Sequence, residues 1–372
     1  MKILTICYEY PPLGGGGAPV CEGLCESLVD RGHHVDVVTS LAKNLPAEEQ
    51  RNGVSIYRTR CLRRHVHYTT TFELLTGIFP ALRKAAELCR TTDYDLIHCH
   101  FIVPSGIVSW LLARQTGTPY LITAHGSDIP GYNEDRFNLS HKLIWPVWKR
   151  IVNGSRSTVT PTRYLGHLLN RQIDKKGEVI PNGINLQRPG PVQPANRILM
   201  VSRIFERKGV DILLRAFSGM NTDWELVIAG DGPLLENAKE LAAELGITVQ
   251  FLGHVDKAQL PDLYQSAKVF VLPSSRENFP VVLLEALAAG CAIITTHGSG
   301  CSEVVGEAGI LVESGSPQAL RLALEELLAD ESQIEMLRRK SLQQVEKFTW
   351  QHISGKYEAL YHQLLLQAHE RP

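Results

Sequence analysis

A strand, a polar loop, a short helix and a second strand follow one another between residues 269 and 296. Residues 269–273 and 292–296 are apolar runs of strand length. Pro280 suits the first position of the helix between them, and Gly290 suits the residue just after its end. Two strands joined through a helix are typical of a parallel α/β sheet, so this unit constrains the fold class of the chain.

Two carboxylates flank the start of this helix. Glu277 precedes it and Glu285 lies within it, and a separation of eight residues corresponds to roughly 80° of helical rotation. The first helical amides, at Val281 and Val282, favour an anion such as phosphate. Carboxylates beside a phosphate are suited to accept hydrogen bonds from sugar and ribose hydroxyls. The alternative is that Glu277 caps the helix and Glu285 is a surface charge, but Glu285 is surrounded by apolar residues.

Length and charge exclude several classes of protein. A chain of 372 residues is long enough for two domains. The net charge of −1 provides no general attraction to nucleic acid, and no zinc-finger spacing is present. No apolar run approaches the roughly 20 residues of a membrane span, and the first residues are too short a run for a signal peptide. The eight scattered cysteines fit free thiols in a reducing cytoplasm.

A glycine-rich loop, residues 14–17, follows the first strand pattern and precedes the first helix pattern. Such a turn lets backbone amides approach a phosphate closely, although four glycines also suit a flexible loop. The spacing differs from the G-x-G-x-x-G pattern of nicotinamide- and flavin-binding proteins, which removes the main support for an oxidoreductase.

Three histidines follow buried strand patterns, at the edge where parallel sheets bind ligands. His98 and His100 end one strand and His125 follows the next. They raise the possibility of zinc, but no matching carboxylate ligand accompanies them, and we expect no metal site. We expect His125 to act on a reacting sugar by hydrogen bonding or acid–base chemistry.

A basic, amphipathic stretch covers residues 58–90, and residues 143–150 have a similar character. Arginines and histidines at 58–67 precede an apolar stretch that contains Phe72, Leu74, Leu75, Ile78, Phe79 and Leu82. The stretch is either an ordinary helix pair with solvated charges or a surface that meets anionic lipid and a lipid-linked acceptor.

The strand–helix alternation restarts after a proline-rich linker at residues 188–195. The next strand leads to a loop with Arg203 and Lys208, cations suited to clamping a diphosphate. We therefore expect domains at 1–188 and 189–348, with a final helix at 349–372 that packs back on the first domain.

In this order the motifs resemble the retaining nucleotide-sugar glycosyltransferases of family 4, over almost the whole chain. The segments that carry the resemblance are the glycine loop, Arg31-Gly32-His33, His98 with His100, His125-Gly126-Ser127-Asp128, Pro181-Asn182-Gly183, Ser202-Arg203, Lys208-Gly209, Gly230-Asp231-Gly232 and the pair Glu277/Glu285. The resemblance implies the GT-B fold, in which two Rossmann-like domains with parallel sheets face one another.

The resemblance also implies roles for individual residues. Arg203 and Lys208 hold the donor diphosphate, Glu277 binds donor-sugar hydroxyls, Glu285 binds the ribose, and His125 contacts the reacting sugar. Asn278-Phe279-Pro280 stands where many members have a glycine, so one amide is missing from the phosphate site. The catalytic set is His125, Glu277, Arg203 and Lys208, and the remaining donor-binding residues are Gly15, Gly16, Gly17, His254, Val255, Asn278, Phe279, Val281, Val282 and Glu285.

The implied reaction transfers a sugar from a UDP- or GDP-linked donor to a hydroxyl of a glycan or lipid-linked acceptor, without a metal cofactor. Retention is expected by attack on the face that the leaving group occupies. We expect a cytoplasmic protein, with peripheral contact at the inner membrane surface and a place in cell-envelope or exopolysaccharide synthesis. The alternatives are a nucleotide-sugar 2-epimerase-like enzyme and a catalytically silent nucleotide-sugar-binding subunit.

Overall fold

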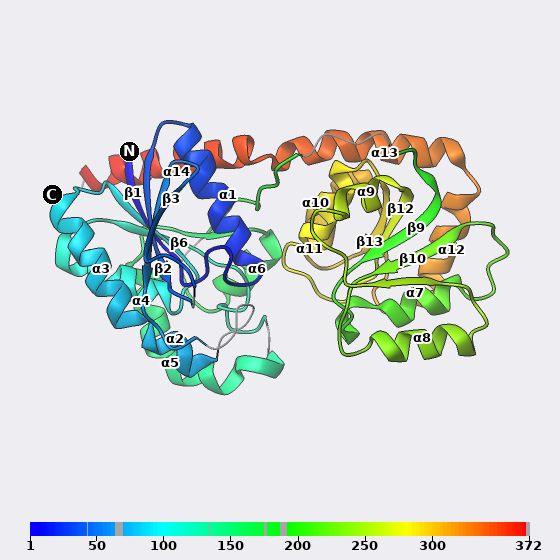
Figure 1. The fold of residues 1–372 in the computed structure, drawn as a ribbon, viewed down its shortest axis with the longest axis horizontal. Coiled ribbons are helices and arrows are strands. Elements are labelled where there is room, and N and C mark those ends of the chain that lie inside the picture. Colours follow the sequence, from blue (N-terminus) through cyan, green and yellow to red (C-terminus); the bar gives the residue numbers. More distant parts are fainter. Residues whose placement is uncertain (43, 64–69, 133, 175–176, 187–191, 370–372) are drawn as a thin grey trace. The chain divides into compact units, whose positions relative to one another are not determined.

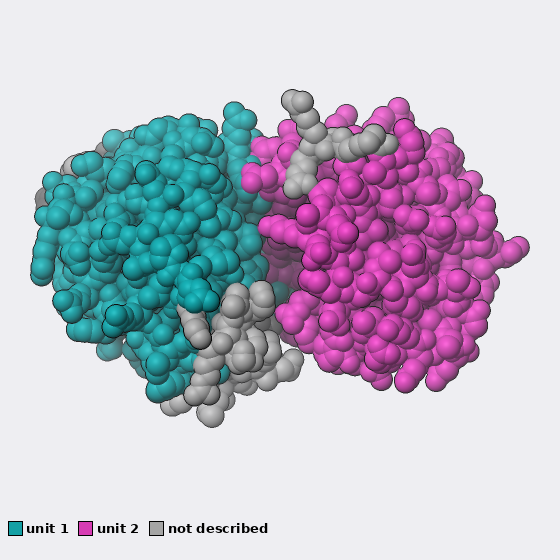
Figure 2. Space-filling model, in the orientation of Figure 1, with its two compact units in different colours: residues 1–183, 350–372 teal, residues 184–349 magenta. Residues whose placement is uncertain are grey.

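A computed structural model describes residues 1–42, 44–63, 70–132, 134–174, 177–186 and 192–369. The chain divides into two compact units (Figure 2). Unit 1 comprises Met1–Gly183 and Trp350–Pro372, and unit 2 comprises Ile184–Thr349. The boundary expected between residues 188 and 189 lies outside the described residues. The chain leaves unit 1 earlier, at Gly183, and returns to it at Trp350.

Unit 1 contains an eight-stranded sheet in the order β3-β4-β2-β1-β5-β6-β7-β8. Among the described residues of this sheet, β3 pairs with β4 in the antiparallel direction and the other neighbouring strands pair in parallel. The strands are β1 Lys2–Ile6, β2 His34–Ser40, β3 Glu48–Arg51, β4 Val54–Thr59, β5 Leu96–His100, β6 Tyr120–Thr123, β7 Thr158–Thr160 and β8 Glu178–Val179.

Strand β3 is absent from the sequence-based prediction. It joins β4 through Asn52 and Gly53, whose φ values are 48° and 80°. An Asn-Gly pair is the usual connection of a two-residue hairpin, because both residues tolerate positive φ. The strand itself is charged and lies at the sheet edge, so its residues lack the apolar pattern on which the prediction relied.

Helices cover both faces of this sheet (Figure 1). Alternate strand residues point to opposite faces, so Ile3 packs with α1 and α14, whereas Leu4 packs with α3, α4 and α5. The C-terminal helix α14 is thus part of the core of unit 1. The helices are α1 Gly17–Asp30, α2 Thr71–Thr76, α3 Ile78–Thr91, α4 Ser105–Thr116, α5 Glu134–Gly154, α6 Arg163–Asn170 and α14 Trp350–His369.

Unit 2 contains a six-stranded parallel sheet in the order β11-β10-β9-β12-β13-β14. Its strands are β9 Ala195–Val201, β10 Glu225–Ala229, β11 Gln250–Gly253, β12 Ala267–Leu272, β13 Ala292–Thr296 and β14 Gly309–Val312. Its helices are η1 Glu206–Lys208, α7 Val210–Phe217, α8 Leu235–Glu244, α9 Leu260–Gln265, α10 Val281–Ala288, α11 Gly300–Val305, η2 Gly306–Ala308, α12 Pro317–Leu328, α13 Glu331–Val345 and η3 Glu346–Phe348.

The order of these strands reverses beside β9. The chain continues from β9 to β10 on one side, and later returns to β12 on the other side. Loops that leave two adjacent parallel strands in opposite directions open a crevice at their carboxyl ends, where ligands of such sheets bind. The loops after β9 and β12 are the ones that carry Lys208 and Glu277.

The helix after β12 agrees with its prediction except at its start. Gly290 follows the end of α10 with φ 71°, as expected of a left-handed residue. Pro280 is the N-cap of α10 and has an extended ψ of 108°, so its expected place at the first helical position is wrong by one residue. The first two helical amides therefore belong to Val281 and Val282.

Candidate active site

Two loops at the carboxyl edge of the unit 2 sheet pack directly on each other. Gly209 ends η1 with φ 72°, and a Cβ at this position would lie 2.4 Å from the Pro273 carbonyl oxygen. The amide of Ser275 donates a hydrogen bond of 2.8 Å to the Arg207 carbonyl. Since only glycine permits this approach, the loop after β9 holds η1 against the loop that carries Glu277.

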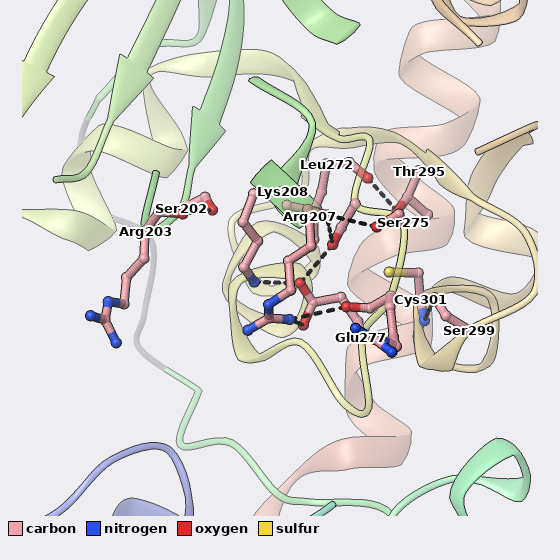
Figure 3. A network of polar contacts seen from close by, with 12 residues as sticks. Ser202, Arg203, Arg207, Lys208, Leu272, Ser275, Glu277, Thr295, Ser299 and Cys301 are labelled. Atoms are coloured by element: carbon pink, nitrogen blue, oxygen red, sulfur yellow. Dashed lines mark hydrogen bonds and ion pairs between the residues drawn. The ribbon is translucent and has the colours of Figure 1, made fainter. Parts of the chain in front are cut away.

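Glu277 is the centre of a polar network between these loops (Figure 3). The residue is only 6% exposed, and its carboxylate accepts a hydrogen bond from Lys208 Nζ at Oε1. Ser274 Oγ lies 2.9 Å from the same oxygen, and Arg207 Nη1 lies 3.6 Å from Oε2. A buried carboxylate is stable in such a place because cations and hydroxyls replace its hydration.

Arg203 lies apart from this network. Its guanidinium stacks over the Phe205 ring at 4.8 Å, and Figure 3 shows it pointing away from Lys208 and Glu277. The side chain is exposed. The structure thus brings Lys208 and Glu277 together, whereas the shared diphosphate role of Arg203 and Lys208 stays a prediction.

Glu285 lies on α10 and has a partner that the sequence did not reveal. The hydroxyl of Tyr264, on α9, donates a hydrogen bond of 2.7 Å to Glu285 Oε2. Burial raises the pKa of the Glu285 carboxyl, and the hydrogen bond from Tyr264 acts in the opposite direction. Because Tyr264 is itself only 1% exposed, this hydrogen bond fixes the carboxylate from within the core.

The other predicted donor-binding residues of unit 2 differ in their surroundings. Val281 is 38% exposed and Val282 is partly buried, as expected of residues at an accessible helix start. Asn278 is buried, and Phe279 packs against Phe348 at a centroid distance of 5.8 Å. In the loop after β11, the His254 side chain is 79% exposed, and Val255 is partly buried against the core.

In unit 1, His125 lies in a loop that Asp128 holds after β6. The Asp128 carboxylate accepts hydrogen bonds from the amides of His125 at 3.0 Å, Gly126 at 2.9 Å and Ile102 at 2.9 Å. The His125 ring packs on Phe101 at 4.4 Å and lies 3.0 Å from His100, measured between Nε2 and Nδ1. Burial lowers the pKa of His125 to about 3, which keeps the ring neutral.

The glycine loop lies beside His125. A Cβ on Gly17, the first residue of α1, would stand 2.4 Å from Phe101 Cζ and 3.4 Å from His125 Cγ. Cβ atoms on Gly15 or Gly16 would meet no atom within 4 Å. The Gly15 amide already donates a hydrogen bond of 3.0 Å to Glu9 Oε2. The phosphate-binding roles of these three glycines remain predictions, and Gly17 has a clear packing role.

Three residues that contact the predicted site were not singled out from the sequence: Glu9, Tyr264 and Ser274. His100 was singled out, but its contact with His125 was not predicted. Ser274 precedes Glu277 by three residues in the same loop, a spacing that signals local contact. Glu9 and Tyr264 gave no such signal, because each reaches its partner through tertiary packing.

No group of three or more histidine, cysteine or acidic residues suited to hold a metal ion occurs in the part of the chain that the structure describes. The expectation of a metal-independent enzyme stays a prediction. Within the same described ranges, no helix is both long enough and apolar enough to cross a bilayer.

A glycosyltransferase family model matches each of the two units. Residues 14–188 match the model "Glycosyltransferase Family 4", and residues 184–344 match "Glycosyl transferases group 1". An uncharacterised glycosyltransferase of Methanocaldococcus jannaschii is 31% identical, over 97% of this chain and 98% of the relative. N-acetyl-alpha-D-glucosaminyl L-malate synthase of Bacillus anthracis is 27% identical, over 98% and 97%.

Solved structures show the fold. Sucrose-phosphate synthase of Thermosynechococcus elongatus superposes with a TM-score of 0.81 at 24% identity, covering 99% of this chain and 100% of that one. Anabaena HepE, solved with UDP, superposes with a TM-score of 0.76 at 16% identity, covering 98% and 100%. This chain has the GT-B fold and belongs to family 4 of the glycosyltransferases.

Proposed function

We propose that this glycosyltransferase takes its sugar from a UDP- or GDP-linked donor and transfers it, with retention, to a hydroxyl of a glycan or lipid-linked acceptor. The observation that carries the donor class is the pairing of Lys208 with Glu277 at the point where the strand order of unit 2 reverses. The related fold of Anabaena HepE, solved with UDP and with UDP-glucose, supports the same class.

The donor roles follow from the chemistry of the unit 2 site. The diphosphate takes its charge compensation from Lys208, Arg203 and the amides of Val281 and Val282. Glu277 binds hydroxyls of the donor sugar. Glu285 binds the ribose through the oxygen that Tyr264 does not occupy. In this proposal the two cations and the amides neutralise the leaving group, and the reaction requires no metal.

Retention is proposed to occur without a covalent intermediate. In unit 2 the buried carboxylate of Glu277 is held by Lys208 and Ser274, which makes it a poor nucleophile. The acceptor hydroxyl attacks on the face of the leaving diphosphate, and a phosphate oxygen takes its proton. Product analysis by NMR should show a retained anomeric configuration, and a glycosyl adduct trapped on Glu277 would exclude this path.

The acceptor side of the proposal concerns an apolar surface on unit 1. Phe72, Leu75 and Phe79 are 68%, 48% and 73% exposed. Leu62, 60% exposed, lies beside them, because its amide donates a hydrogen bond of 3.0 Å to Thr76 Oγ1 at the end of α2. We propose that this α2–α3 surface meets an anionic membrane that presents a lipid-linked acceptor. Arg64, His65 and His67 of this stretch lie outside the described residues.

In the second predicted surface stretch, residues 143–150, Trp148 packs in the core and does not lie at the surface. Trp148 is 2% exposed, and its Nε1 donates a hydrogen bond of 2.8 Å to the Asp128 carbonyl. It therefore braces the loop that holds His125. Trp145 is partly buried and stacks on Trp148 at a centroid distance of 5.2 Å.

Binding of UDP, GDP and ADP sugars, measured by calorimetry and thermal shift without metal, tests the donor proposal. One nucleotide class should bind wild type and bind Glu285→Ala much more weakly. Failure of all donors to bind wild type would favour the silent-subunit alternative. Release of free nucleotide without transfer to any acceptor would favour the epimerase-like alternative.

A further inference from the structure

A row of buried rings connects His125 to the C-terminal helix α14 of unit 1. The Tyr361 hydroxyl lies 2.8 Å from His98 Nδ1, and His98 Nε2 lies 2.8 Å from Thr123 Oγ1. The centroids of the His98 and His100 rings are 4.5 Å apart, and His100 Nδ1 lies 3.0 Å from His125 Nε2. The row ends at the histidine expected to contact the donor sugar.

A single proton lies between His100 Nδ1 and His125 Nε2. Both rings are neutral, because burial lowers the pKa of His125 to about 3 and that of His100 well below its usual value. A neutral imidazole has one N–H, so one ring donates and the other accepts. If His125 donated, the proton of His100 would be on its Nε2.

The surroundings of His100 decide between these two arrangements. His100 is fully buried, and its Nε2 has no hydrogen-bond partner among the residues that the structure describes. A buried N–H without an acceptor is rarer and costlier than a buried acceptor without a donor. The arrangement with the proton on His100 Nδ1 leaves only a lone pair unpartnered.

We infer that His100 is a positioning residue, whose Nδ1–H donates to Nε2 of His125 and fixes His125 as the Nδ1–H tautomer. His125 then has a hydrogen-bond donor at Nδ1 and no lone pair available to act as a base. On the basis of the proposed function, His125 is then a hydrogen-bond donor to an oxygen of the reacting sugar. Of the two roles expected for His125, this tautomer permits hydrogen bonding and excludes acid–base chemistry.

Long-range ¹H–¹⁵N NMR of labelled wild-type protein at neutral pH tests the tautomer without any substrate. His125, assigned through a His125→Gln variant, should show a protonated Nδ1 and an unprotonated Nε2. His100→Asn places an amide N–H near the original Nδ1 and should keep this pattern, whereas His100→Leu should lose it. A protonated Nε2 in wild type, or an unchanged tautomer in His100→Leu, would overturn the inference.

An activity measurement separates this inference from the proposed function. With the donor that binds wild type, His100→Leu should lower kcat about tenfold and leave the Kd for the nucleoside diphosphate unchanged, while His100→Asn stays near wild type. Equal loss in both variants would contradict a positioning role. Should His100→Leu not fold, His100→Gln replaces it, since its amide lies near the Nε2 position. If no nucleotide binds, the proposed function fails and the NMR result still decides the tautomer.

Discussion

The hydroxyl of Tyr264, on α9, donates a hydrogen bond of 2.7 Å to Oε2 of Glu285, on α10. The bond occupies one oxygen of the carboxylate predicted to bind ribose and leaves the other for a ligand. Because Tyr264 is buried, its hydroxyl is held in place by the core of unit 2, and Glu285 is oriented before any nucleotide arrives.

Replacing Tyr264 by phenylalanine should weaken nucleotide binding. Tyr264→Phe removes the donor and little else, so Glu285 gains rotational freedom and its pKa rises further. We expect the Kd for the nucleoside diphosphate that binds wild type to rise about fivefold, equivalent to about 1 kcal/mol. Calorimetry with the ribo- and 2′-deoxy forms of that nucleotide should show a smaller preference for ribose in the variant than in wild type.

Glu285→Gln provides the matched control, since it abolishes the charge and should reduce the ribose preference more than Tyr264→Phe does. A Tyr264→Phe variant with lower thermal stability but an unchanged ribose preference would show that the hydrogen bond serves the fold alone.

The Lys208–Glu277 pair should be needed for the stability of unit 2. Lys208→Met removes the cation that pairs with the carboxylate of the buried Glu277, and breaking such a pair costs about 3 kcal/mol. Adding Glu277→Gln should restore part of this loss, because the buried charge is then gone. Urea unfolding measures both variants. Arg203→Met is the control and should leave stability unchanged, because Arg203 is exposed.

The strand and helix around Glu277 were predictable because nearly all of their residues are apolar, Lys268 in β12 and Glu285 in α10 being the exceptions. The carboxyl ends of β9 and β12 were placed at one edge by topology alone, which brought Lys208 and Glu277 to the same site. The partners that came from tertiary packing were not predictable. Glu9 reaches the Gly15 amide across a loop, and Tyr264 reaches Glu285 from a different helix.

Two further differences have local causes. The charged strand β3 is identified by its Asn52-Gly53 turn and not by any apolar pattern. Trp148 was expected near an interfacial surface because it neighbours Lys149 and Arg150 in sequence. Its place in the helix turns it to the core instead, where its indole N–H donates to Asp128.

Substitutions in the glycine loop should separate packing from backbone freedom. Gly17→Ala puts a methyl group 2.4 Å from Phe101 Cζ, so Phe101 and His125 must shift, at a cost of about 1–3 kcal/mol. Gly16→Ala should be tolerated, because its Cβ meets no atom within 4 Å and its φ is −62°. Thermal unfolding of both variants makes the comparison. Equal destabilisation would refute the packing role of Gly17.

Acid should destabilise unit 1 through its buried histidines. Burial lowers the pKa of His98 and His125 to about 3, so the unfolded chain binds protons below about pH 6.5 that the folded protein excludes. Stability is therefore full above that pH and falls as the pH drops toward 3, by about 1.4 kcal/mol per pH unit for each histidine. His98→Gln should make this slope shallower, although it also lowers stability at neutral pH.

Tryptophan fluorescence is a suitable probe for this titration, because Trp110, Trp145, Trp148 and Trp350 belong to unit 1 and only Trp224 belongs to unit 2. The exposed His167, on α6 of the same unit, supplies the control. His167→Gln should leave the slope as in wild type, and an identical slope in His98→Gln would argue against a neutral, buried His98.

The α2–α3 surface should bind anionic membranes. Phe72 and Phe79 are seven residues apart, about two helical turns, and Gly77 between α2 and α3 keeps helical angles of −81° and −15°. Both rings therefore lie on one side, with the exposed Arg60 and Arg83 nearby in the chain. Flotation with phosphatidylglycerol vesicles should show binding that phosphatidylcholine vesicles do not support and that added salt weakens.

Phe72→Ser combined with Phe79→Ser should lower this partitioning at least about tenfold, because two exposed aromatic rings no longer enter the interface. Leu322→Ser is the matched control, since Leu322 is 60% exposed on α12 of unit 2 and should not matter. An equal loss in both variants would indicate non-specific adsorption. Wild-type protein that ignores anionic vesicles would leave the acceptor as a glycan that is not presented by a membrane.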